Sequence, residues 1–493
     1  MSEYAGTQKS LAFLLLSALA MACFADYLFY GKDLGVSYPL FFIAMYALLL
    51  WEAKRRGTLV PFPRNREAWL LTLPVLLLAC TFFLFSNPLF HALNLFVVPF
   101  LFVAQSLLLA DSQRKKWDSF GFLEEMLRFV FVHTLPNMRL PFRYAKGWVK
   151  GRMDRRGIAL KILTGIGLSL PILLVVIPLL AKADSVFAHF FNELPRMVYS
   201  WHFIFTAFRM FWILFVALVV FAYFYSLWSR SEDREAAPIP KAEGEKVVWD
   251  GIVLVTVLLV VNLVYMSFTY IQISYLFSGA RAVLPAGMTY AEYARSGFAE
   301  LVWVTLINFA ILFSAMLYGS REKQGLYRTV QMLLSLLTVC TGFLLFSAYY
   351  RLSLYETAYG YTYTRFLAHA FMIVLFILLL LALLKVWREG LSLAKSYLVI
   401  GLAAYIAVQY VNMDALIAQN NIARYYETGK LDVQYLAELS WDAVPAIMPL
   451  TRDTQHGEWL TSMLQEKRDE LRKQQPWQSF NLSRYVASTY FYP

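Results

Sequence analysis

The segment SAYYRLSLYETAYGYTYTRF, residues 347–366, lies between two long apolar runs and organises the interpretation of the whole chain. It contains six tyrosines, two arginines and one glutamate. Both flanking runs are long enough to cross a bilayer, so this polar segment is predicted to be a hairpin at one face of the membrane. Arg351, Tyr355 and Tyr359 recur at the spacing of one helix face, and Gly360 is suited to ending that helix.

Two interpretations of the hairpin remain open. Thr362 or Thr364 is expected to cap the helix that follows, whose first turn carries Arg365. In the first interpretation the tyrosines form an aromatic belt and the arginines extend toward lipid headgroups. In the second, the same residues form the floor of a ligand-binding site.

The composition identifies an integral membrane protein. The 493 residues are 59% hydrophobic and only 16% charged, with a mean hydropathy of +0.53. Soluble proteins have about a quarter charged residues. Apolar segments of about 20 residues recur up to residue 412, and no strand-length alternation is present. The predicted fold is therefore an all-α, polytopic helix bundle.

About eleven transmembrane helices are predicted within a bundle domain that covers residues 1–412. They lie near 10–28, 37–53, 68–85, 91–109, 158–180, 203–227, 248–277, 297–318, 328–349, 365–386 and 396–412. Residues 413–493 are polar and form a predicted tail domain of four helices. The last transmembrane helix is expected to continue to Glu427, Gly429 to end it, and Asp432 and Ser440 to cap the next two. We expect this domain to be a small helical cap outside the cytoplasm.

The distribution of Lys and Arg predicts the orientation of the bundle. The even-numbered connections are basic, and residues 111–156 alone carry eleven Lys and Arg against five Asp and Glu. Basic connections face the cytoplasm. The N-terminus is therefore expected inside and the C-terminus outside, in the inner membrane of a bacterium. Because the net charge of +11 belongs mostly to these connections, nucleic-acid binding is not inferred.

The basic connection at 110–157 contains one further predicted helix, at about 118–134. Phe120, Leu123, Leu127 and Val130 form an apolar stripe along it. We expect this helix to lie in the membrane interface, where the surrounding basic residues contact anionic lipids. Docking of a protein partner at the same connection is a second interpretation.

Sequence motifs for catalysis are missing from the chain. It contains no phosphate loop, nucleophile elbow, dinucleotide fingerprint or paired Cys and His spacing. Its three cysteines fall inside predicted spans and its six histidines are scattered. We therefore predict no metal site and no cofactor, and the sequence does not favour an enzyme.

Ionisable residues near the ends of spans gather toward the predicted outer side. Arg209 is the clearest case, because the helical rise places it about 9 Å inside the outer boundary. An unpaired arginine at that depth is costly. We expect Arg209 to form a structural ion pair with Asp184 or Glu300, or to contact a ligand.

Four segments resemble a known family. They are LLAKADSVF at 179–187, YRLSLYETAYGYTYTRF at 350–366, NMDALIAQNNIARY at 412–425 and LDVQYLAELSWDAVPAI at 431–447. They are similar to bacterial multi-pass membrane proteins of the domain-of-unknown-function 4153 and 4173 type. The resemblance implies a bacterial membrane protein and supplies no activity.

The leading functional hypothesis is a cell-envelope protein with an outward-facing pocket that binds or senses a lipid or an anionic headgroup. The candidate ligand-binding residues are Arg351, Tyr355, Glu356, Arg365, Arg281, Arg295, Glu300, Asp414, Asn421 and Arg424. One alternative is an enzyme that acts on lipid-linked substrates from outside, with Asp26, Glu300 or Asp414 as general base. The other alternative is a transporter.

Overall fold

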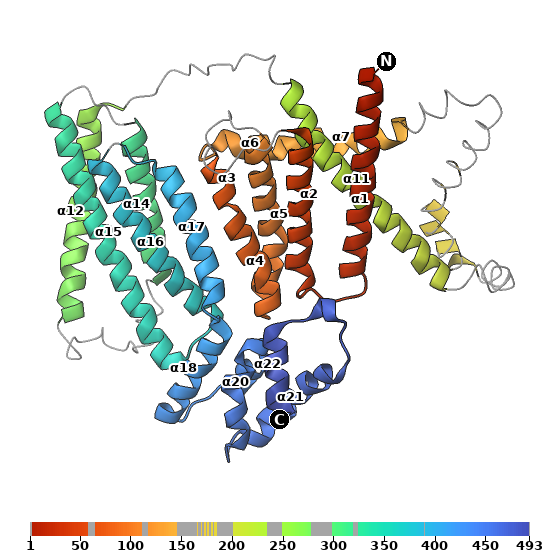
Figure 1. The fold of residues 1–493 in the computed structure, drawn as a ribbon. Coiled ribbons are helices and arrows are strands. Elements are labelled where there is room, and N and C mark those ends of the chain that lie inside the picture. Colours follow the sequence, from red (N-terminus) through yellow and green to blue (C-terminus); the bar gives the residue numbers. More distant parts are fainter. Residues whose placement is uncertain are drawn as a thin grey trace, which may run out of the picture. The chain divides into compact units, whose positions relative to one another are not determined.

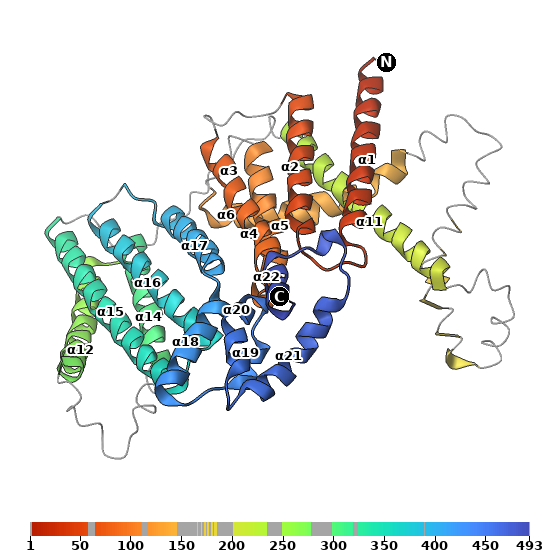
Figure 2. The ribbon, with the colours of Figure 1, turned by 60° about the horizontal axis from the view of Figure 1, so that its bottom comes forward.

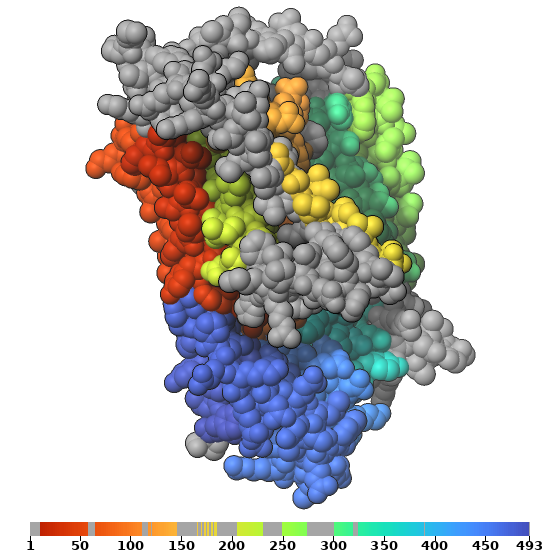
Figure 3. Space-filling view, turned by 90° about the vertical axis from the view of Figure 1, so that its right-hand side faces the viewer, coloured from red at the N-terminus to blue at the C-terminus, as the bar shows by residue number. Residues whose placement is uncertain are grey.

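The computed structural model describes residues 2–57, 65–110, 117–144, 201–233, 249–277, 298–318, 324–388 and 390–492, with single positions between 165 and 184. Within these ranges the chain is helical and has no β-strand, which confirms the all-α prediction (Figure 1). The tail residues, drawn in blue, gather in one mass in the space-filling view (Figure 3).

Nine helices of the described ranges are long and apolar enough to cross a membrane. They cover Ser10–Phe29, Arg66–Leu84, Pro88–Ala110, Phe205–Ser229, Gly251–Ile273, Glu300–Tyr318, Gln324–Tyr359, Tyr363–Trp387 and Leu393–Tyr410. The predicted span at 37–53 corresponds to α2 (Ser37–Arg56), a helix of 20 residues that is not among the nine. Most of the predicted span at 158–180 lies outside the described residues.

Contacts divide the chain into two compact units, Met1–Thr72 with Phe100–Ala237, and Leu73–Pro99 with Pro238–Pro493. In the first unit, α1 (Ser2–Phe29) packs along α11 (Trp201–Asp233) and against α2. The short α6 (Phe120–Arg128) continues into a π-helical turn, η1 (Phe129–Thr134), and α7 (Leu135–Asn137). In Figure 1, α6 lies across the direction of α1 and α2.

The α6 helix has two apolar faces, where the sequence predicted one stripe. Phe122 and Met126 are buried against the unit, whereas Leu123 and Leu127 of the predicted stripe are exposed. The exposed leucines are free to contact lipid, and that contact stays a prediction. Most basic residues of the 110–157 connection lie outside the described residues, and so does any partner site built from them.

The second unit is organised around α15 (Gln324–Tyr359). It packs against α12 (Gly251–Phe277), α14 (Phe298–Tyr318) and α16 (Tyr363–Trp387). Its 36 residues give a helix of about 54 Å, well beyond the ~30 Å hydrocarbon core. Part of α15 therefore extends past the apolar layer, and the polar segment 347–359 is expected to be that part.

Hydrogen bonds hold α17 (Leu393–Tyr410) to α4 (Thr72–Leu84) and to the first half of α5 (Pro88–Ala110) within the second unit. The buried Asn94 donates to Thr81 Oγ1 at 2.9 Å and to Gln409 Oε1 at 2.7 Å, and it accepts from Tyr405 Oη at 2.8 Å. Interhelical amide bonds of this kind associate helices in an apolar solvent.

The tail consists of short helices (Figure 2), and its buried residues share one core with Phe90 of α5. They are α18 (Met413–Thr428), α19 (Val433–Glu438), η4 (Trp441–Ala443), α20 (Val444–Ile447), η5 (Met448–Arg452), α21 (Gly457–Arg472), η6 (Trp477–Ser479) and α22 (Leu482–Phe491). Ile417, Val433, Leu436, Ile447 and Leu460 are fully buried together. This core buries apolar side chains of α18, α19, α20 and α21.

The predicted caps of the tail are present, and one predicted junction is wrong. Gly429 ends α18 with a φ of 69°, and the side chains of Asp432 and Ser440 cap α19 and η4. The last transmembrane helix does not continue into α18. Asn412 adopts a left-handed conformation, with a φ of 53°, and its side chain accepts from Ala415 N at 3.2 Å. Asparagine tolerates this conformation, and the chain restarts there as a new helix.

Candidate functional site

The α15–α16 hairpin is built on Gly360. The chain turns there with a φ of 86°, which favours glycine, and a Cβ at this position would lie 2.7 Å from Asn421 Oδ1. The helix therefore ends at Tyr359 as predicted, and α16 begins at Tyr363 with Thr362 at its N-cap position. The close approach of α18 fixes the turn.

Two predicted ligand residues of α18 bind the backbone of this turn. The Asn421 amide accepts from Tyr361 N and donates to Tyr361 O, both at 2.8 Å. The Arg424 guanidinium donates to Thr357 O at 2.9 Å and to Ala358 O at 2.6 Å. The last carbonyls of a helix have no partner within the helix, so Arg424 acts as a C-cap of α15. Asn421 and Arg424 thus hold the hairpin in place.

Arg365 and Tyr355 contact each other across the hairpin. The guanidinium carbon lies 4.3 Å from the centre of the Tyr355 ring, which is within the range of a cation–π interaction. The Tyr359 ring lies 4.9 Å from that of Tyr355. Arg365 Nη1 donates to Gly360 O. Within the described part of the chain, the other N–H groups of this guanidinium have no hydrogen-bond acceptor and remain available to an anion.

Glu356 and Arg351 have partners on neighbouring helices. The buried Glu356 carboxylate contacts His369 Nε2 at 2.9 Å, and the His369 ring packs 4.3 Å from that of Tyr349. Arg351 Nη2 donates to Gln272 Oε1 of α12 at 3.3 Å. These contacts connect α15 to α16 and α12 at the level of the hairpin.

Asp414 lies in a different, buried cluster of the second unit. The side chain is 1% exposed, and its two oxygens accept from Asn87 Nδ2 at 2.8 Å and from Ser440 N at 2.9 Å. Burial raises the pKa of Asp414, and these hydrogen bonds oppose the rise. The same cluster reaches the start of α16, because Tyr435 Oη accepts a hydrogen bond from Tyr363 N at 3.0 Å. Burial raises the pKa of Tyr435 to about 12, so its hydroxyl keeps its proton at neutral pH.

Three more candidates complete the predicted set. Glu300 is exposed in the first turn of α14. Its neighbour Leu301 packs with Ala348 and Leu352, so Glu300 lies at the end of α14 near the hairpin. Arg281 and Arg295 lie outside the described residues.

The predicted partners of Arg209 are wrong. Its Nε lies 3.0 and 2.9 Å from the two carboxylate oxygens of Asp26, in the first unit. The pair joins α1 to α11, and the Tyr30 ring lies 4.7 Å from the guanidinium. Asp184 is exposed, and neither it nor Glu300 is the partner. The sequence shows Asp26 near a span end but does not show that the first and sixth predicted spans are neighbours.

The residues that sequence reasoning missed are the polar partners of the candidates. They are Asn87, Gln272, His369 and Ser440. The Asn87-Pro88 pair is a usable signal, because a proline at the first helical position favours an Asn cap before it. Asn87 Oδ1 indeed accepts from Phe90 N at 3.2 Å. In the described ranges, no three His, Cys, Asp or Glu side chains are placed to hold a metal ion.

The comparison with protein families is consistent with this architecture. A family model described as a domain of unknown function, DUF4153, matches residues 72–450, well over half of the chain. The chain belongs to this family. The match includes the α15–α16 hairpin and α18. These two elements carry seven of the ten candidate ligand-binding residues. No curated protein and no solved structure matches the chain.

Proposed function

We propose that this DUF4153 protein binds an anionic lipid headgroup at the α15–α16 hairpin. The observation that carries the proposal is Arg365, a half-buried guanidinium stacked on Tyr355 with most of its N–H groups unused by described residues. A guanidinium binds phosphate or carboxylate through two parallel hydrogen bonds. The neighbouring tyrosine rings suit the sugar or the acyl region of a lipid, because they combine an apolar face with a polar end.

The framework around Arg365 supports binding without rearrangement. Asn421 and Arg424 fix the turn that carries Arg365, and Glu356 with His369 connects the two helices of the hairpin. Because these contacts already fix the hairpin, it loses little conformational entropy when a ligand binds. Glu356 is buried, and its Oε2 lies 2.9 Å from His369 Nε2, so this carboxylate is directed at His369.

The proposal places the hairpin outside the cytoplasm, in the inner membrane of the bacterial cell envelope. The support is the alternation of basic connections along the sequence. In this orientation the tail is an extracytoplasmic helical cap. It carries Asn421 and Arg424, which hold the hairpin in place. The bundle would then comprise about eleven spans, including α2 and the segment at 158–180.

The geometry gives less support to the enzyme and the transporter. Of the three carboxylates considered as a general base, Asp26 is paired with Arg209, and both oxygens of Asp414 accept hydrogen bonds in a buried cluster. The polar side chains around Asn94 bond to one another between helices. Such bonds account for helix association and do not require a transported substrate.

Titration with lipids in native mass spectrometry tests the proposal. The full chain in detergent is titrated with phosphatidylglycerol, which is anionic, and with phosphatidylcholine, which is zwitterionic. We expect tighter binding of phosphatidylglycerol. Arg365→Gln should reduce this preference about tenfold, because it removes the charge and the planar fork, while Arg365→Lys should retain only part of it.

The matched control is Arg472→Gln in α21. Arg472 is also an arginine of the second unit, its side chain is 62% exposed, and it lies 3.7 Å from Asp469. This variant loses one positive charge at a position away from the hairpin and should bind both lipids like the parent. If Arg365→Gln and Arg472→Gln show the same lipid preference as the parent, the hairpin is a membrane anchor and not a headgroup site.

A further inference from the structure

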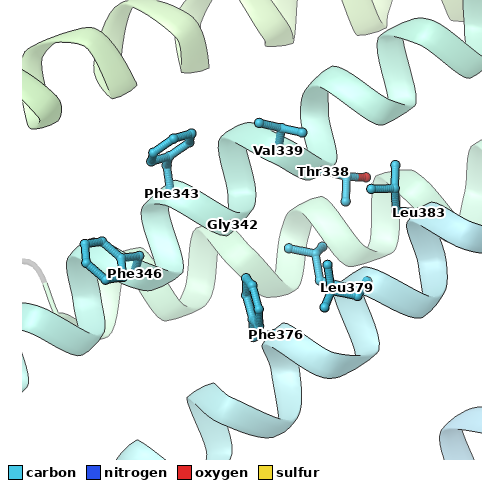
Figure 4. A pocket seen from close by; sticks show the side chains of 9 residues that line it. Thr338, Val339, Gly342, Phe343, Phe346, Phe376, Leu379 and Leu383 are labelled. Carbon is cyan, nitrogen blue, oxygen red and sulfur yellow. The ribbon is translucent and has the colours of Figure 1, made fainter.

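An apolar groove runs between α15 and α16 on the membrane-spanning part of the hairpin. It has a volume of about 400 Å³ and is lined by nine residues of these two helices (Figure 4). Thr338 is the polar residue of the lining, and its hydroxyl is already bonded to Leu334 O at 2.7 Å. The surface that the groove offers is therefore hydrocarbon.

The floor of the groove exists because residue 342 is a glycine. A Cβ at Gly342 would lie 3.8 Å from Leu379 Cδ2 and 3.9 Å from a ring carbon of Phe376, which are ordinary contact distances. An alanine therefore fits, whereas the further carbons of a larger side chain extend into the groove. Leu379 and Thr338 are buried beneath it.

The walls are aromatic and stand away from the helix contact. Phe343 and Phe346 of α15 are 47% and 58% exposed, and Phe376 of α16 is 44% exposed. Figure 4 shows the two phenylalanines of α15 on one side and Phe376 on the other. Just beyond Phe346, toward the hairpin, the rings of Tyr349 and His369 meet across the two helices. The groove is thus apolar along its length, and the Tyr349–His369 pair lies beyond its lining on the side of the hairpin.

We propose that this groove binds one acyl chain of a membrane lipid, with the polar part of the lipid beside Tyr349 and His369. Both helices are membrane spans, so the groove lies where lipid chains are the solvent. A flexible chain gains dispersion contacts in a concave surface that it lacks on a convex one. The tyrosine and histidine at the end supply the amphipathic groups that favour the headgroup region.

This inference goes beyond the proposed function, because it assigns a second site that recognises a chain and not a charge. The groove lies on α15 and α16 within their spans, whereas Arg365 lies in the first turn of α16. The two sites can be occupied by one lipid or by two. Substitutions can therefore separate them.

Photolabelling tests the groove. The full chain in detergent micelles receives increasing amounts of phosphatidylcholine with a diazirine in the middle of one acyl chain, and labelled peptides are mapped after irradiation. Labelling of 338–346 and 376–383 should saturate as the probe increases. Labelling at the exposed Met332 and Phe371 should rise in proportion to the probe. Gly342→Leu should reduce groove labelling at least threefold, and Gly342→Ala should reduce it less.

Gly401→Leu in α17 is the matched control. A Cβ at Gly401 has no atom within 4 Å, so the same substitution adds bulk to a span without touching the groove. It should leave groove labelling unchanged. A repeat with a phosphatidylglycerol probe separates the two sites, since Arg365→Gln should alter only the preference between headgroups and Gly342→Leu should lower labelling by both probes.

Two results would overturn the inference. Groove labelling that rises linearly and is equal in the parent, Gly342→Ala and Gly342→Leu proteins means that ordinary surrounding lipid passes over this surface. Labelling confined to Met332 and Phe371, with none in the groove, means that another segment of the chain or a second copy covers it. Either result leaves the headgroup proposal for Arg365 standing.

Discussion

Arg209 and Arg365 are two arginines near span ends that the structure uses in opposite ways. Arg209 places its Nε 3.0 and 2.9 Å from the two oxygens of Asp26, a carboxylate that is 5% exposed. Arg365 has a ring and one backbone carbonyl as its partners in the described residues. The Arg209 guanidinium completes an ion pair between α1 and α11, whereas the Arg365 guanidinium keeps N–H donors that a ligand can use.

Structural and ligand-binding cations in a membrane protein can be separated by what each leaves behind when it is removed. A buried carboxylate needs its cation, so removing the cation leaves an uncompensated charge in an apolar medium. A guanidinium on a tyrosine ring leaves no such charge when it is replaced. Stability should therefore respond strongly to the first arginine and weakly to the second, and lipid binding should respond in the reverse order.

The largest expected effect is that of Arg209→Ala. We expect the free energy of unfolding to fall further than in the other variants described below, because Asp26 loses its counter-charge while staying buried. Thermal unfolding of the purified full chain measures the change. Adding Asp26→Asn to this variant should restore part of the loss, since the amide carries no charge.

Arg128→Ala provides the control for that experiment. Arg128 and Glu124 lie on one face of α6 at 3.9 Å, and their side chains are 69% and 64% exposed. Exposed pairs of this kind contribute about 0.3–0.5 kcal/mol. A loss of stability in Arg209→Ala no larger than in Arg128→Ala would mean that the Asp26 pair is not structural.

A smaller effect is expected at Arg424, which caps α15. Its replacement by alanine removes hydrogen bonds to Thr357 O and Ala358 O and should destabilise the protein by about 1–2 kcal/mol. Hydrogen–deuterium exchange should quicken in 355–361 before it changes elsewhere. Arg365→Gln should lower stability by less than Arg424→Ala does, because it removes one ring contact and one hydrogen bond to the backbone. Equal losses of stability in Arg424→Ala and Arg365→Gln would mean that Arg365 holds the hairpin in place as Arg424 does.

The sequence predicts the helices well because their signals are local. Apolar length defines the spans, Gly360 and Gly429 mark helix ends, and Asp432 and Ser440 mark helix starts. At Asn412 the same reasoning fails. The sequence around Asn412 does not differ from that of a continuous helix. The break between α17 and α18 depends on the Asn412 side chain, which accepts a hydrogen bond from Ala415 N.

The candidate site is predicted less completely, because partners depend on which helices are neighbours. The polar hairpin and its arginines are visible in residues 347–366. The sequence does not show that Arg424 reaches the carbonyl of Ala358, or that Glu356 meets His369, because these contacts join residues on different helices. The pairing of Arg209 with Asp26, 183 residues apart, is hidden for the same reason.

Lipid-dependent thermal stabilisation of the full chain shows whether Arg365 binds an anionic headgroup. A ligand that binds only the folded state raises the unfolding temperature as its concentration exceeds its Kd. Phosphatidylglycerol and phosphatidylcholine are added at equal concentration to the parent and to the Arg365→Gln and Arg424→Ala proteins. We predict that phosphatidylglycerol stabilises the parent by several degrees more than phosphatidylcholine does.

Arg365→Gln should lose this difference while unfolding near the parent temperature in phosphatidylcholine. Arg424→Ala should unfold at a lower temperature in both lipids. It should keep part of the extra stabilisation by phosphatidylglycerol, because Arg365 is still present. If Arg365→Gln keeps the full extra stabilisation by phosphatidylglycerol, the anion binds elsewhere and the account of the hairpin is contradicted.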